Sequence, residues 1–214
     1  MLTRLRSVAR RDDAGFTLVE LMVAMFIFSI LLVILTAGIS AMSRSTVRVT
    51  ASGEAMTDLN RLYNRLDKEV PYATALNRQV LSGGDWYLEY FTDSTEAGAR
   101  PFCTQYRLDT SARAVQVRSW NTEGALGLTG WTTLAVDVVP RAGSPWLVRP
   151  ADDTYVRQRL TVAVDVEQPA TPVQQLDTTF VARNTTPDTG TNADQDADGR
   201  SDSEVCMNQG VGRS

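Results

Sequence analysis

The amino-acid sequence predicts an α+β fold in which one long N-terminal α-helix packs on an antiparallel β-sheet. An uncharged apolar run at residues 21–43 is followed by an amphipathic stretch that reaches Val70. Beyond residue 80, short segments rich in β-branched and aromatic residues alternate with turn residues. Sequential strands with short connections favour antiparallel pairing, with one face of the sheet on the helix.

The composition argues against several classes of function. The chain has 214 residues, of which 43% are hydrophobic, enough for a membrane segment and one domain of ordinary size. Its net charge of −4 argues against a nucleic-acid-binding body, so no nucleic-acid partner is predicted. The sequence contains no histidine, the commonest general base and transition-metal ligand. Because no nucleophile elbow or metal triad is found either, we expect no enzyme activity and no organic cofactor.

The first 43 residues have the pattern of a membrane anchor. Residues 1–15 form a leader with four arginines, and residues 16–43 are long enough to cross a hydrocarbon core of about 30 Å. The arginines predict a cytoplasmic leader and an exported C-terminal part. Glu20 is the only charge between Phe16 and Ser43. Because a charge inside the membrane costs roughly 2.5–3.5 kcal/mol, we expect Glu20 to have a partner. A plain signal anchor and a cleaved secretory signal are the alternatives.

The segment Gly15-Phe16-Thr17-Leu18-Val19-Glu20 resembles the type IV prepilin signature, with Gly before the cut, an apolar residue after it, and Glu at the fifth mature position. The resemblance implies cleavage between Gly15 and Phe16 by a membrane prepilin peptidase, and N-methylation of Phe16. It also implies that residues 16–43 are retained as a transmembrane and filament-core helix, the first half of a pilin-like lollipop. In style the chain is similar to PilW-like minor pilins and J-type pseudopilins.

The function that this resemblance implies is structural. Cleavage would free an amine on Phe16, and Glu20 of a neighbouring subunit can pair with it, which makes a buried carboxylate tolerable. The chain would then be a minor pilin or pseudopilin of an extracytoplasmic type IV pilus or a related secretion or DNA-uptake filament. Its partners would be the peptidase, other pilin subunits, the assembly platform and, before assembly, the lipid of the bacterial inner membrane. The alternative is a single-pass, membrane-anchored extracytoplasmic protein that binds a ligand.

Residues 44–76 are expected to continue the helix. Pro71 predicts that it ends near Val70, since the residue before proline avoids helical geometry. The Ser/Thr-rich segment Ser43–Ser52 suggests a flexible junction. An apolar stripe is expected to pack on the sheet, with a coiled-coil partner as the alternative. The stripe consists of Val49, Met56, Leu59, Tyr63, Leu66 and Val70.

Residues 77–183, which we call the head, are expected to be β-rich. Two of the predicted strands form a hairpin around residues 109–113. Aromatic side chains in the head are expected to pack in the core, with a ligand groove as the alternative. The predicted strands are Trp86–Thr92, Phe102–Leu108, Ala114–Trp120, Trp131–Val139, Tyr155–Glu167 and Leu176–Arg183.

Residues 184–214, which we call the tail, are polar and acidic. Within them, oxygen-bearing side chains alternate from Asp194 and are followed by a glycine, a pattern similar to the first half of an EF-hand loop and to thrombospondin type-3 calcium loops. A disordered, solvated tail is the alternative. If Ca²⁺ binds, the expected ligands are the side chains of Asp194, Asp196, Asp198 and Asp202 and the carbonyl of Arg200, with Glu204 as a further source.

The two cysteines, Cys103 and Cys206, can form one intramolecular bridge if the head lies outside the cytoplasm. Closing a loop of this length stabilises the folded chain by up to ~4.7 kcal/mol in the loop-entropy model. A C-terminal region bounded by a disulfide is also common in the pilin family. Two free thiols are the alternative.

Overall fold

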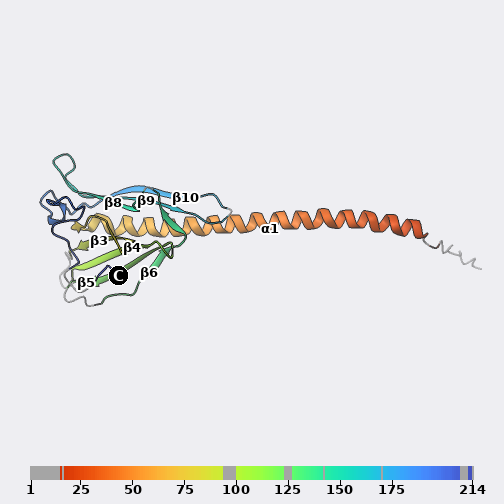
Figure 1. The fold of residues 1–214 in the computed structure, drawn as a ribbon, viewed down its shortest axis with the longest axis horizontal. Coiled ribbons are helices and arrows are strands. Elements are labelled where there is room, and N and C mark those ends of the chain that lie inside the picture. Colours follow the sequence, from red (N-terminus) through yellow and green to blue (C-terminus); the bar gives the residue numbers. More distant parts are fainter. Residues whose placement is uncertain are drawn as a thin grey trace, which may run out of the picture. The chain divides into compact units, whose positions relative to one another are not determined.

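The computed structural model describes residues 15, 17–93, 100–122, 127–141, 143–169, 171–207 and 212–213. The chain divides into two compact units, Met1–Val47 and Arg48–Ser214, which we describe separately. Helix α1 (Leu18–Glu69) contributes to both units (Figure 1).

In the first unit, helix α1 begins directly after Thr17. The backbone N–H of Glu20 donates a hydrogen bond to Thr17 Oγ1 at 3.3 Å, so Thr17 caps the helix. Hydroxyl groups farther along donate to carbonyls of the preceding turn; Thr36 Oγ1, for example, lies 2.8 Å from the Leu32 carbonyl. The hydroxyls of Ser29, Thr36 and Ser40 are thereby satisfied within the helix, as a hydrocarbon environment requires.

Residues 43–52 are helical, so the predicted continuation of the helix beyond residue 43 is confirmed, and the flexible junction suggested by their Ser/Thr content stays a prediction. Thr46 Oγ1 donates to the Met42 carbonyl at 3.0 Å, which keeps its hydroxyl paired without leaving the helix. This stretch contains no proline, and serine and threonine lower helix propensity only modestly.

In the second unit, the buried face of α1 differs from the predicted stripe. Ala55 and Leu62 are buried, whereas Met56 is 47% exposed and Val49 is 70% exposed. Leu59, Leu66 and Val70 are buried as predicted. This part of α1 packs one face into the core that it shares with both sheets, and its opposite side stays exposed. As Pro71 predicts, α1 ends at Glu69 and one 3₁₀ turn, η1 (Val70–Tyr72), follows.

A six-stranded antiparallel sheet contributes to the core on which the buried face of this segment packs. Its strands pair in the order β1-β3-β4-β5-β6, and β2 also pairs with β3. The predicted hairpin is confirmed as β4 and β5, with Asp109 opposite Ala114 at its turn. The strands are β1 (Ala75–Leu76), β2 (Val80–Ser82), β3 (Asp85–Thr92), β4 (Phe102–Asp109), β5 (Ala114–Asn121) and β6 (Thr132–Ala135).

A second antiparallel sheet, of four strands, contributes to the same core. Strand β9 is central, with β10 along one edge and both β7 and β8 along the other. The strands are β7 (Val138–Pro140), β8 (Trp146–Arg149), β9 (Arg159–Val166) and β10 (Gln174–Val181). The sequence predicted a single sheet, without β8.

The strand predicted at Trp131–Val139 is in fact two strands in different sheets. Asp137 adopts a left-handed conformation with φ of 57°, which breaks the strand between β6 and β7. The turn is held from both sides: the Glu167 N–H donates to the Asp137 carbonyl at 2.9 Å, and the Val138 N–H donates to the Arg113 carbonyl at 2.8 Å. The chain crosses from one sheet to the other at this point.

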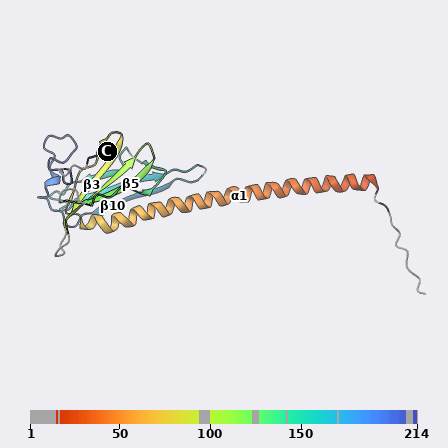
Figure 2. The same ribbon diagram turned by 90° about the horizontal axis from the view of Figure 1, so that it is seen from below.

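Helix α1 and both sheets share one hydrophobic core. Tyr106 of β4 meets Trp146 of β8 edge-on, with ring centroids 6.2 Å apart, so the two sheets touch directly. On the outer side, the ring of Tyr63 in α1 lies 5.6 Å from that of Phe180 in β10, and the two elements run side by side (Figure 2).

The C-terminal end of α1 is tied to the six-stranded sheet through Glu69. One carboxylate oxygen accepts a hydrogen bond from Arg65 Nε at 2.8 Å, and the other accepts from the hydroxyls of Tyr90 and Tyr106. Burial, together with the nearby Glu69 carboxylate, raises the pKa of both Tyr90 and Tyr106 above its usual value. Both phenols therefore remain donors to Glu69.

Candidate functional site

The residues predicted for processing lie at the start of α1. Gly15 and Glu20 are exposed, whereas Phe16 and the leader residues 1–14 lie outside the described residues. Because α1 begins at Leu18, the predicted Gly15–Phe16 cleavage bond precedes the helix, where a protease can take the backbone in extended form. Glu20 occupies the first turn, where a carboxylate is favoured by the helix dipole.

The apolar segment that follows has no internal packing partner among the described residues. Its large hydrophobic side chains are exposed on every side of the helix, for example Met22 at 65%, Phe26 at 66% and Val33 at 67%. The helix is long and apolar enough to cross a membrane, and no residue of its most apolar window is buried. A surface of this size requires lipid or other protein to cover it.

Comparison with known families agrees with this geometry. The family model for the prokaryotic N-terminal methylation motif matches residues 10–36. The chain carries a prepilin-type methylation motif. No curated protein and no solved structure matches the chain.

The prepilin-type motif includes Gly15, Phe16 and Glu20, and it supports a type IV pilin-like family. It implies a subunit that is processed by prepilin peptidase and assembles with other pilin subunits. Together with the apolar part of α1 it fits a single-pass anchor in the inner membrane. The long helix packed against antiparallel sheets is an α+β, pilin-like architecture.

The aromatic side chains that could have lined a ligand groove mostly pack inside the head. Tyr87, Tyr90, Trp120 and Trp146 are all at most 2% exposed. Trp131 is partly exposed, and the guanidinium groups of Arg107 and Arg118 lie 4.5 and 4.2 Å from its ring centroid. The partners of these side chains are therefore the protein's own residues.

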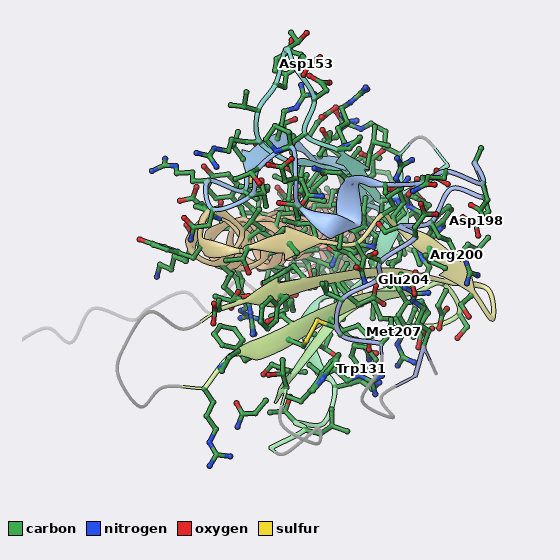
Figure 3. The ribbon with its side chains drawn as sticks, turned by 90° about the vertical axis from the view of Figure 1, so that its left-hand side faces the viewer. Trp131, Asp153, Asp198, Arg200, Glu204 and Met207 are labelled. Atoms are coloured by element: carbon green, nitrogen blue, oxygen red, sulfur yellow. A yellow bond between two sulfur atoms is a disulfide. The ribbon has the colours of Figure 1, made fainter. Side chains whose placement is uncertain are left out.

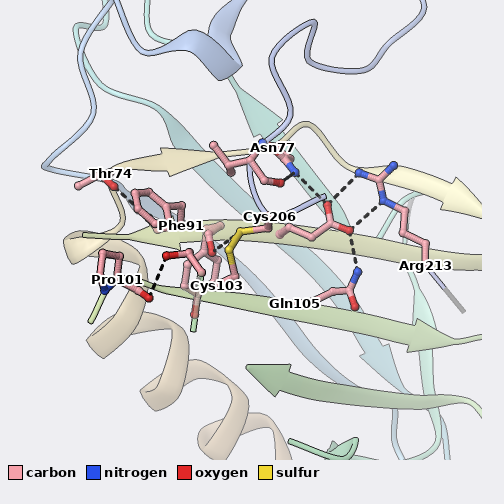
Figure 4. Close-up of a disulfide and its surroundings, with 12 residues drawn as sticks. Thr74, Asn77, Phe91, Pro101, Cys103, Gln105, Cys206 and Arg213 are labelled. Carbon is pink, nitrogen blue, oxygen red and sulfur yellow. Dashed lines mark hydrogen bonds and ion pairs between the residues drawn. A yellow bond between two sulfur atoms is a disulfide. The ribbon is translucent and has the colours of Figure 1, made fainter. Parts of the chain in front are cut away.

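The predicted disulfide is present and joins the tail to strand β4. Cys103 and Cys206 are bonded across 103 positions of sequence, with their Cα atoms 5.7 Å apart. Both sulfurs are buried beside Trp120 in a small hydrophobic cluster separate from the main core. Figure 4 shows the bond against the sheet, with polar side chains next to it.

These polar side chains surround the fully buried carboxylate of Glu89 in β3. Arg213 binds Glu89 through two nitrogens at 2.9 and 3.1 Å, and also reaches Glu204 at 2.8 Å. Gln105 Nε2 donates to Glu89 at 3.0 Å (Figure 4). Burial alone would lower the pKa of Arg213, but its hydrogen bonds to Glu89 and Glu204 outweigh burial and raise it. Arg213 therefore stays charged.

Asn77 provides a second attachment for the tail. Its amide Nδ2 donates to the Val205 carbonyl at 2.8 Å, and its Oδ1 accepts from the Val205 N–H at 2.9 Å. The side chain thus pairs with the tail as a neighbouring strand would. Because the disulfide, Arg213 and Asn77 all hold it, the tail is anchored rather than solvated at its C-terminal end.

The structure brings together three of the residues predicted for Ca²⁺. Asp194, Asp196 and Asp202 each offer a carboxylate oxygen, and these oxygens all lie within 4.8 Å of one another. Asp198 lies outside this group and accepts a hydrogen bond from the Arg200 N–H at 2.7 Å. Glu204 is engaged by Arg213 instead. In Figure 3, Asp198 and Arg200 lie at the periphery of the tail and Glu204 lies closer to the strands.

Sequence reasoning did not identify Arg78, Asn77 or Glu89 as partners of the tail, nor Arg213 as the tail residue that pairs with Glu89. Each is more than 110 positions from the residue that it contacts across the sheet. A local pattern of spacing carries no information about such contacts.

Proposed function

We propose that the chain is a minor pilin or pseudopilin, a non-catalytic structural subunit of an extracytoplasmic filament of the type IV pilus, secretion or DNA-uptake class. The observation that carries this proposal is the prepilin-type motif directly followed by a helix with apolar side chains exposed on all sides. The motif supports cleavage and methylation, and the exposed apolar helix supports packing against other subunits after cleavage.

The apolar part of α1 would serve twice. In the inner membrane its surface faces lipid, and beyond the first turn its backbone N–H groups pair within the helix. After extraction the same side chains can pack against helices of neighbouring subunits, because a helix that is hydrophobic all round is stable only when it is covered.

Glu20 would direct this assembly. Cleavage after Gly15 produces an amine on Phe16, and the carboxylate of Glu20 in an adjacent subunit is the charge that can neutralise it. Glu20 is exposed, and neither the hydrogen bonds nor the ion pairs of the described residues engage its carboxylate, so it is available to another chain. In the filament core the paired charges are tolerable, whereas a lone carboxylate would be costly.

An extracytoplasmic location for the head is supported by two features. The arginines of the leader favour its retention in the cytoplasm and export of the rest. The buried Cys103–Cys206 bond is of the kind that persists in oxidising compartments.

The assembly role can be tested with Glu20→Ala in cells that make the filament. We expect normal cleavage, because the cleaved bond lies outside the helix, and loss of most of the subunit from sheared filaments, with the processed chain left in the membrane. Glu54→Ala is the matched control, since Glu54 is an exposed carboxylate on the same helix. Incorporation of the Glu20 variant at the wild-type level would refute the pairing role. Absence of the wild-type chain from filaments would favour the membrane-anchored binding protein instead.

A further inference from the structure

We propose that the tail holds one Ca²⁺ ion between Asp194, Asp196 and Asp202, and that this site depends on Arg78. The ligand set is narrower than the one that the spacing of acids predicts, since Asp198 and Glu204 are excluded from it. The site is remote in sequence from the prepilin-type motif and does not depend on the filament role.

The distances between the three carboxylates suit a single ion. Their oxygens all lie within 4.8 Å of one another. Oxygens that bind the same Ca²⁺ at 2.3–2.6 Å can be at most about 5 Å apart, so one ion can reach all three without rearrangement of the loop.

The burial of the Asp194 side chain is a second, independent observation that favours a bound cation. Its side chain is only 8% exposed. Oδ2 pairs with Arg78 Nη1 at 2.8 Å, whereas Oδ1 is buried and has no hydrogen-bond partner. A buried carboxylate oxygen without a partner is costly, and a cation in the group formed with Asp196 and Asp202 would supply the partner.

Arg78 positions this side chain without neutralising the group. It neutralises one carboxylate, while three negative charges lie together. Its backbone N–H also donates to Ser201 Oγ at 3.1 Å, and its Nη2 donates to the Asn192 carbonyl at 3.3 Å. Arg78 therefore fixes both ends of the 194–202 loop, which orients Asp194 toward the other two acids.

Access and donor chemistry favour a hard cation. Asp196 and Asp202 are exposed and line a surface cleft of about 820 Å³, so an ion can enter from solvent. The chain has no histidine, and both its cysteines are in the disulfide, so it offers no nitrogen or thiolate ligand of the kind that zinc and copper prefer. Carboxylates on a loop, completed by carbonyls and water, suit Ca²⁺ better than the strictly octahedral Mg²⁺.

The test is calorimetric titration of the full-length chain, in detergent micelles and stripped with a chelator, with CaCl₂ and separately with MgCl₂. We expect one Ca²⁺ per chain and weaker binding of Mg²⁺. At a hundredfold excess over Kd, Ca²⁺ should raise the Tm by about 5–10 °C.

Asp196→Asn and Asp202→Asn test the ligand set. Each should weaken Ca²⁺ binding by at least about tenfold, the loss that removal of even an outer-sphere partner typically causes. Both side chains are exposed, so circular dichroism of the ion-free variants should match the wild type. Asp194 is left intact, because losing its pair with Arg78 would disturb the tail itself.

Asp198→Asn is the matched control, since this exposed acid lies between the two ligands in sequence but outside the group. It should bind Ca²⁺ as the wild type does. The proposal is overturned if the wild type binds no Ca²⁺ at millimolar concentration, if Mg²⁺ binds more tightly, or if Asp198→Asn weakens binding as much as Asp196→Asn does.

Discussion

At the scale of single residues, a buried ion pair helps to attach the tail to the sheet. Glu89 is fully buried in β3, and Arg213, near the C-terminus, neutralises it. A buried ion pair gives little net stability over an apolar replacement, but removal of one partner leaves the other uncompensated. Loss of either Glu89 or Arg213 would therefore weaken the attachment of the C-terminal end, which the disulfide and Asn77 also hold.

We expect Glu89→Gln to lower the free energy of unfolding by about 3–5 kcal/mol, because Arg213 then remains buried with Glu204 alone. Urea unfolding of the full-length chain in micelles, with the disulfide intact, measures this loss. Asp177→Asn is the control: Asp177 also pairs with an arginine, Arg141, but is 56% exposed. It should cost at most about 1 kcal/mol. Equal losses in the two variants would show that burial of the Glu89 pair is unimportant.

At the scale of elements, the second half of α1 shows what a pattern of apolar residues can and cannot locate. Leu59 and Leu66 were correctly placed on the buried face, because their spacing is helical. Met56 was placed there too, yet it is 47% exposed, whereas Ala55 and Leu62 are buried. The direction of the face depends on where the second sheet lies, and nothing local in the helix specifies that.

This shift predicts unequal effects of truncation along α1. Leu62→Ala should lower the free energy of unfolding by about 2–5 kcal/mol, because Leu62 is fully buried in the core. Met56→Ala, one and a half turns earlier, should cost no more than about 1 kcal/mol, since much of its side chain already contacts solvent. Chemical denaturation of the two variants under identical conditions makes the comparison. A larger loss of unfolding free energy in Met56→Ala than in Leu62→Ala would contradict this and support the buried stripe expected from spacing alone.

For the strands as for α1, the features with local sequence signals were predicted and those set by distant contacts were not. β3, β4, β5 and β10 were predicted to within two residues at each end, because their alternation and turn residues are local signals. The separation of β6 from β7 was not predicted. It depends on the left-handed turn at Asp137, which hydrogen bonds to residues 113 and 167, far away in sequence, hold in place. The second sheet was not predicted either, because β7 and β8 join β9 only through pairing between residues distant in sequence.

At the scale of the whole molecule, the structures of the two units are specified by different kinds of sequence information. The first is specified almost entirely by local pattern: the prepilin-type motif, the apolar run and the cap at Thr17 lie within residues 10–47. The second is specified by contacts between distant residues, such as Cys103 with Cys206. The disulfide was nevertheless predictable, because two cysteines allow only one intramolecular bridge.

The central claim is that the chain is processed between Gly15 and Phe16 and used with its apolar helix intact. Mass spectrometry of the N-terminal peptide of the protein, isolated from cells that contain a prepilin peptidase, tests this most directly. The account predicts a chain that begins at Phe16 and carries a methyl group on its amine, and an uncut chain when the peptidase is deleted. A chain that begins after Gly38 or Ala41, or one that retains residues 1–15 in the presence of the peptidase, would contradict it.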